Sequence, residues 1–199
     1  MSYDIRLMDR VSEEPIQLPV KHIMTGGTYQ ADYDAETGTF SPAAINEAWL
    51  NITYNYSRYY YEAAEGDERF YGEERYPSEE EKGKIQNLGI RGIYGKSGAE
   101  SISMLNDLVD RIEQKYKVNG KWISVMREEH EFYDKSGNKV EGIIAFLKKL
   151  DVTERVYEKE VNEGSTDDYW LPTAANAIRP LHQLIAMASL RPDGVWDGD

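Results

Sequence analysis

The clearest helical pattern in this chain is SGAESISMLNDLVDRIEQKY, Ser97–Tyr116. Its apolar residues recur at three- and four-residue spacing, which places them on one face of an α-helix. They are Ile102, Leu105, Leu108, Val109, Ile112 and Tyr116. Ser97 and Glu100 form the S-x-x-E pattern of a capping box, in which each side chain accepts a hydrogen bond from the other residue's backbone N–H. We therefore predict an amphipathic helix over Gly98–Tyr116.

A second helix is predicted over Ala174–Leu190, where Thr173 is a typical N-cap and the later Pro192 and Gly194 mark the end. Its buried stripe consists of Ile178, Leu181, Leu184, Ile185 and Ala188. Pro180 conflicts with a regular helix, because proline lacks the backbone N–H and clashes with the preceding turn. Pro180 therefore predicts either a kink or a later helix start near Arg179.

Two segments, Tyr3–Asp9 and Trp49–Ser57, alternate between apolar and polar residues, the period of a strand with one buried face. In the second segment the predicted faces are Leu50, Ile52, Tyr54 and Tyr56 against Asn51, Thr53, Asn55 and Ser57. Ser41–Pro42 predicts the start of a short helix, since serine caps helices and proline suits their first position.

Further along, VNGKW and DKSGNK are turn signals between strands predicted near Trp122–Met126 and Glu131–Tyr133. A short helix is predicted over Glu141–Leu150, and the segment TERVYEKEVNE fits either a helix or a strand. Together these elements predict an α+β fold: a small, mostly antiparallel sheet packed by two main helices.

The 199 residues suffice for one hydrophobic core, and we predict a single domain over 1–199. Residues 62–84 are rich in Glu, Gly, Arg and Tyr and poor in aliphatic side chains. Such a composition buries little surface, which predicts an acidic surface loop. Alternatively, its tyrosines and Phe70 could fold over a ligand.

The net charge of -13 and the absence of a basic stripe argue against general DNA or RNA binding. A small anionic ligand remains compatible, because a few donors in a pocket can act against an acidic surface. The lack of cysteine excludes disulfides, thiolate zinc sites and a cysteine nucleophile. No segment is typical of a signal peptide or a membrane helix, so we predict a cytoplasmic protein without membrane contact.

The loop GIRGIYGKSGAES, Gly89–Ser101, is the first candidate site. A phosphate-binding P-loop requires G-x-x-x-x-G-K-[ST], and here the leading glycine is replaced by Ile90. Even so, a helix N-terminus favours anions through its free N–H groups, and Arg91 and Lys96 add positive charge. The alternative is that the loop only caps the helix. In the binding interpretation, the phosphate ligands are Arg91, Gly95, Lys96, Ser97 and Gly98, with the backbone amides of Gly95–Ala99.

Aromatic and amide side chains suited to a base or ribose are Tyr54, Asn55, Tyr56 and Tyr94, and Thr28, Tyr29 and Trp170 complete the candidate set. The three histidines show no metal-ligand spacing, and no nucleophile elbow occurs. The sequence thus favours binding over catalysis and predicts neither a cofactor nor a metal.

Five blocks together resemble a family of small, uncharacterised proteins of bacteriophages and prophages. The blocks are GGTY, WLNITYNYS, GIRGIYGKSGAES, DDYWLPTAANA and LRPDGVWDGD. Compared with that shorter pattern, 62–84 and the hairpin and helix segment 117–164 look like insertions. The resemblance implies an accessory protein acting inside an infected bacterium, where countering host defence and changing nucleotide metabolism are frequent tasks.

The leading hypothesis is a protein that sequesters a small nucleotide-type signal of host defence without cleaving it. A second hypothesis is an acidic inhibitor that contacts a host enzyme through Glu62–Glu81. A third is a metal-dependent nucleotide hydrolase using Asp167, Asp168 and His182. An edge strand is a candidate dimer surface, so a homodimer is also possible.

Overall fold

The fold is taken from a computed structural model, which describes residues 2–23, 31–42, 44–75, 77–142, 149 and 151–199. Its central sheet is antiparallel in the order β14-β1-β6. The strands are β1 (Ser2–Met8), β6 (Trp49–Thr53) and β14 (Val195–Gly198). Alternation along β1 buries Tyr3, Ile5 and Leu7 on one face, as the sequence predicts.

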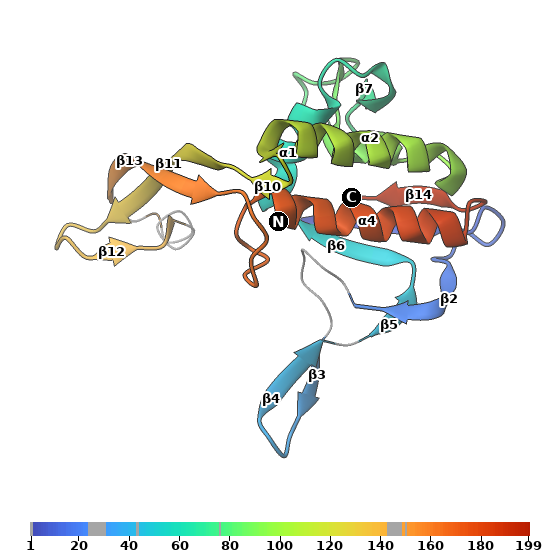
Figure 1. The fold of residues 1–199 in the computed structure, drawn as a ribbon, viewed down its shortest axis with the longest axis horizontal. Helices are drawn as coiled ribbons and strands as arrows, with labels where there is room; N and C mark the ends of the chain where they lie inside the picture. The colour runs from blue at the N-terminus through green and yellow to red at the C-terminus, as the bar shows by residue number, and fades with distance from the viewer. Residues whose placement is uncertain (1, 24–30, 43, 76, 143–148, 150) are drawn as a thin grey trace.

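Helices α2 (Gly98–Tyr116) and α4 (Ala174–Leu190) lie side by side over that face (Figure 1). Both have the predicted bounds. Ser97 and Glu100 form the complete capping box of α2, and the Thr173 side chain caps α4. The α+β fold is therefore confirmed. No helix in the described part of the chain is both long and apolar enough to cross a bilayer.

Pro180 lies inside α4, which begins at Ala174, so a later start near Arg179 is wrong. The first turn is held by other groups. The Ala174 N–H donates to a Glu163 carboxylate oxygen at 2.7 Å, and the Ala175 N–H donates to the Glu163 carbonyl at 3.0 Å. These bonds satisfy N–H groups that a helix cannot bond within itself.

The strand predicted over Trp49–Ser57 is confirmed for Trp49–Thr53 and wrong for the residues that follow. After β6 the chain forms a 3₁₀ turn, η1 (Tyr54–Tyr56), and then helix α1 (Ser57–Ala64). Residues at three- and four-residue spacing become buried here: Tyr56, Tyr59, Tyr60, Ala63 and Ala64. The helical spacing of these buried residues therefore determines the structure after Thr53, although the residues up to Ser57 also alternate like a strand.

The helix predicted from Ser41–Pro42 is also wrong, because that segment ends a strand of a hairpin. The strands of the N-terminal half are β2 (Gln17–His22), which pairs with β5 (Ile45–Glu47), and β3 (Ala31–Asp34), which pairs with β4 (Thr39–Pro42).

Residues 62–84 are more ordered than an acidic loop. After α1 come the 3₁₀ turn η2 (Glu68–Phe70) and strand β7 (Tyr71–Glu73), which pairs with β8 (Ile85–Asn87). Most of the described segment lies at the surface, as the composition predicts, but Phe70 is completely buried. A further 3₁₀ turn, η3 (Gly89–Ile93), leads to α2.

Beyond α2, a long three-stranded sheet, which we call the arm, projects away from the helices (Figure 1). Its root is the small hairpin of β9 (Lys117–Val118) and β10 (Lys121–Trp122), whose turn at Asn119 and Gly120 has positive φ angles, as the VNGKW signal predicts. The arm consists of β11 (Ser124–Tyr133), β12 (Lys139–Val140) and β13 (Thr153–Asn162) in the order β12-β11-β13. Most of the helix predicted over Glu141–Leu150 lies outside the described residues.

Candidate functional site

The backbone of the loop before α2 is not available to a phosphate. Each N–H from Gly95 to Glu100 donates to another group of the protein. The acceptors of Gly95, Gly98 and Ala99 are carbonyls of Trp196, Gly194 and Pro192, at 2.9, 2.9 and 3.0 Å. The role of the Gly95–Ala99 amides in holding phosphate is therefore contradicted by the structure.

These bonds fasten the start of α2 to the C-terminal segment, and we call this region the α2–β14 junction. The Trp196 indole is buried and donates to the Ser101 hydroxyl at 2.7 Å. A Cβ added at Gly98 would lie 2.6 Å from the Arg191 carbonyl oxygen, so the close approach requires glycine. Ser97 and Gly98 are therefore structural residues, whose hydrogen bonds cap and dock a helix.

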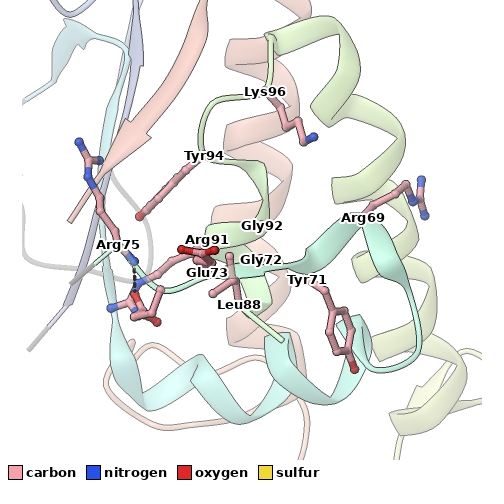
Figure 2. Close-up of a pocket in the computed structure, with 11 residues that line it drawn as sticks. Arg69, Tyr71, Gly72, Glu73, Arg75, Leu88, Arg91, Gly92, Tyr94 and Lys96 are labelled. Carbon is pink, nitrogen blue, oxygen red and sulfur yellow. Dashed lines mark hydrogen bonds and ion pairs between the residues drawn. The ribbon is translucent and has the colours of Figure 1, made fainter. Parts of the chain in front are cut away.

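A pocket of about 400 Å³ opens beside this junction, between the β7–β8 hairpin and η3 (Figure 2). Figure 2 shows Arg75 and Tyr94 on one side of the pocket and Arg69 and Tyr71 on the other. The residues lining it are Arg69, Tyr71, Gly72, Glu73, Glu74, Arg75, Leu88, Arg91, Gly92, Tyr94 and Lys96. Four of them are cationic and two are acidic, so the pocket is positive in a chain of net charge -13.

Arg91 is the most buried of these cations, with 18% of its side chain exposed. Its guanidinium carbon lies 5.2 Å from the ring centre of Tyr3 and 5.4 Å from that of Tyr54, a cation–π arrangement. One terminal nitrogen donates to the Tyr54 hydroxyl at 2.6 Å, and the other lies 3.5 Å from Glu74. Its Nε is buried and finds no acceptor among the described residues.

The Tyr54 ring contacts Arg91 in a cation–π arrangement. Its hydroxyl accepts from Arg91 and donates to the Asp199 carboxylate at 2.8 Å. Burial raises the pKa of Tyr54 above its ordinary value, so the phenol stays protonated at neutral pH. Tyr54 is therefore a positioning group for Arg91 and does not line the pocket.

The other three cations differ in how they are held. Arg69 pairs with Asp67 and Asp107, and Arg75 pairs with Asp197. The exposed Lys96 side chain makes no hydrogen bond or ion pair with any residue that the structure describes. Arg69 and Arg75 thus form fixed walls, while Lys96 is able to meet an incoming anion.

The structure separates the predicted site residues into groups. Arg91, Tyr94 and Lys96 line the pocket. Asn55 and Tyr56 instead bond the carbonyls of Trp170 and Tyr169, and none of these four residues is among those lining the pocket. Thr28 and Tyr29 lie outside the described residues.

Four further residues line the pocket that the sequence does not predict as site residues: Arg69, Tyr71, Glu74 and Arg75. All four belong to 62–84, where composition indicates an acidic loop. A usable signal is Asp67, a typical N-cap, followed by the aromatic pair Phe70–Tyr71. The second hypothesis also loses support here, because carboxylates of Glu62, Asp67, Glu74 and Glu79 are paired with cations of the same chain.

The described residues contain no group of three or more His, Asp and Glu side chains that could hold a metal ion. Asp167, Asp168 and His182 are therefore not brought together as a metal site, and all three are exposed. The Asp168 carboxylate accepts from the Trp170 N–H at 3.0 Å, a local turn contact. The hydrolase hypothesis has no support in the geometry.

Compared with known proteins, the chain matches no family model, no curated sequence and no solved structure. The resemblance to phage proteins, the cytoplasmic location and a homodimer all stay predictions.

Proposed function

We propose that this protein binds a small phosphorylated ligand in the Arg91 pocket and holds it without cleaving it. Two donors of the pocket carry the proposal, because no described residue accepts from them: the Nε of the largely buried Arg91 and the exposed ammonium group of Lys96. A guanidinium and an ammonium group are the donors that proteins use for phosphate oxygens.

The remaining walls suit the organic part of such a ligand. Tyr71, Tyr94 and Leu88 offer aromatic and apolar surface, on which a base or a sugar can pack. The cavity of about 400 Å³ lies within the usual range for small-molecule sites, roughly 300–1,000 Å³. The pairing of Arg69 with Asp67 and Asp107 holds one wall in place before binding.

The resemblance to phage proteins is the ground for naming a nucleotide-type signal of host defence as the ligand class. Sequestration requires that the ligand is bound tightly and stays chemically unchanged. It therefore requires neither a nucleophile nor a general base. The pocket wall offers cations and aromatic rings, with Glu73 and Glu74 as its acidic groups. Glu74 faces Arg91, which favours its role as a counter-charge.

The test is a thermal-shift screen with cyclic dinucleotides, cyclic ADP-ribose isomers and ordinary nucleotides, followed by mass analysis of the ligand recovered after heat denaturation. At about a hundred times its dissociation constant, a true ligand adds roughly 2.7 kcal/mol, a shift of several degrees. We expect one class to shift the midpoint and to be recovered intact. Recovery of fragments, or no shift with any of these compounds, contradicts the proposal.

Lys96→Ala supplies the site-specific arm of this experiment. Lys96 is exposed and makes no side-chain bond with a described residue, so its removal leaves the fold intact. We expect binding to weaken roughly tenfold, the effect of losing one charge-assisted contact. The matched control is Lys121→Ala, which removes an exposed lysine outside the pocket and changes the net charge equally. Equal losses in both variants indicate general charge attraction and refute the site.

A further inference from the structure

The arm presents two faces of opposite character. The register between β11 and β13 is unbroken from Ser124 opposite Asn162 to Tyr133 opposite Thr153. Successive side chains of a strand point to opposite faces, so the register assigns every residue to one of them. The acidic face consists of Ser124, Met126, Glu128, His130, Phe132, Glu154, Val156, Glu158, Glu160 and Asn162.

On the other face, which we call the paired face, the charges satisfy one another. Glu129 accepts from Lys159 at 2.8 Å, and Glu131 accepts from Lys139 and Tyr133. The hydrogen bond from Lys139 lowers the pKa of Glu131 to about 2. This face therefore requires no partner to satisfy its carboxylates.

The acidic face carries four glutamates and no lysine or arginine. Glu154 contacts His130 at 2.6 Å, whereas Glu128, Glu158 and Glu160 make no side-chain hydrogen bond or ion pair within the described residues. Glu128 lies directly opposite Glu158, and like charges in that position destabilise a strand pair. The repulsion between these two carboxylates is not relieved by a cation of any described residue.

Two apolar side chains stand exposed among these glutamates. Met126 is 58% exposed and Val156 is 53% exposed. On this face Val156 lies between Glu154 and Glu158, while Met126 is next to Glu128 and opposite Glu160. A surface with apolar side chains at its centre and charge around them is typical of a protein-binding site.

The root of the arm is fixed to the body of the protein. Arg127 donates to the buried Glu163, to the Tyr59 hydroxyl and to the Pro172 carbonyl. Glu163 has no exposed side-chain surface, and it also accepts from the first turn of α4. These contacts set the direction in which the arm and its acidic face project.

We propose that the acidic face docks a basic protein segment, rich in lysine and arginine and carrying apolar side chains among its cations. The cations would meet Glu128, Glu158 and Glu160, and the apolar side chains would cover Met126 and Val156, which lie on either side of the Glu128–Glu158 pair. Complementary charge favours this occupant, since a second copy of the acidic face repels and nucleic acid is an anion. A metal ion is not favoured, because no three His, Asp or Glu side chains among the described residues lie close enough together to hold one.

The experiment uses the full chain and a fluorescein-labelled peptide of about twelve residues that repeats Lys-Ser-Val-Ser, so that the extended peptide presents lysine and valine on the same face. The same peptide with glutamate in place of lysine is the second probe. Fluorescence anisotropy is measured at about 50 mM and about 300 mM salt, because screening separates charge from apolar contact. We expect the basic peptide to bind and the acidic peptide not to bind. Failure of the basic peptide to bind at low salt overturns the proposal.

The variant Glu128→Gln/Glu158→Gln/Glu160→Gln keeps the size of the side chains and removes three charges. We expect at least a roughly tenfold loss of peptide affinity, without loss of folded structure, because like-charge repulsion is relieved. The matched control is Glu65→Gln/Glu68→Gln/Glu80→Gln, three exposed glutamates outside the arm. Equal losses in the two triple variants mean that the peptide senses only net charge, which overturns the acidic face as a site.

Val156→Thr tests the apolar part with a side chain of similar shape. We expect a few-fold loss that persists at about 300 mM salt, where charge attraction is weakened. If Val156→Thr leaves affinity unchanged at both salt concentrations, the apolar contact is refuted.

Discussion

The α2–β14 junction and the acidic face of the arm differ in how completely their polar groups are satisfied. At the junction, all six N–H groups from Gly95 to Glu100 have acceptors in the protein. On the acidic face, three carboxylates have no bonded partner among the described residues. Yet the sequence predicts a phosphate-binding loop at the junction and only an inserted segment at the arm.

Residue type alone therefore does not locate a site. Glycine, serine and lysine before a helix are the residues of an anion loop, and they are equally the residues of a capped, closely packed helix start. What distinguishes the two is whether the polar groups are already bonded. By that criterion the binding capacity lies in Lys96, in the Nε of Arg91 and in the unpaired glutamates of the described arm.

The largest expected effect comes from removing the centre of the junction. Trp196→Ala deletes a buried indole and leaves a cavity, so we expect a loss of about 3–5 kcal/mol in the free energy of unfolding. Urea denaturation followed by circular dichroism measures it. Trp170→Ala is the control, because Trp170 is 46% exposed and its removal should cost about 1 kcal/mol or less. Similar costs for both tryptophans would show that the junction is not a structural centre.

A smaller effect is expected on acidification. Hydrogen bonds from Arg69 and then Arg111 hold the pKa of Asp67 well below its usual range. A carboxylate with a lowered pKa stabilises the fold above its unfolded-state pKa, about 3.9, and this contribution is lost as the pH falls further. Stability should therefore decline below about pH 4 in the wild type.

Asp67→Asn sharpens this prediction. It removes the titrating carboxylate, so we expect roughly 1–2 kcal/mol lower stability at neutral pH and a flatter decline in acid. Urea midpoints measured across the acid range provide the comparison. A parallel decline in wild type and variant assigns the acid sensitivity to other groups.

The smallest effect concerns the helix cap. Ser97→Ala removes the acceptor of the Glu100 N–H, 3.2 Å away, and should cost about 1 kcal/mol. Thermal unfolding detects a change of this size as a shift of a few degrees. No change in the midpoint would mean that the capping box contributes nothing to the fold.

Much of the fold can be predicted from local signals. The bounds of α2 and α4 follow from caps and apolar periodicity, because both signals are local and agree with each other. The end of β6 cannot be placed in this way, since Tyr54 and Tyr56 fit an alternating strand as well as a helical turn. Only the packing of Tyr60 and Ala64 against the core decides in favour of α1.

The candidate site is predictable in part for a different reason. Arg91 and Lys96 stand out because they lie near a helix start, which is a property of sequence. Arg69 and Arg75 reach the pocket through the β7–β8 hairpin, a long-range arrangement that composition hides. Likewise, the separation of arm residues into a paired face and an acidic face depends on the register of two strands distant in sequence.

The most direct test of the account compares two neighbouring side chains, Lys96 and Ser97, in one titration. A phosphorylated ligand found in the thermal-shift screen is titrated by calorimetry into the wild type, Lys96→Ala and Ser97→Ala. We predict that Lys96→Ala binds roughly tenfold more weakly, whereas Ser97→Ala keeps its affinity and loses only thermal stability. The opposite result, with Ser97→Ala impaired and Lys96→Ala unaffected, would return the site to the helix start and contradict the account.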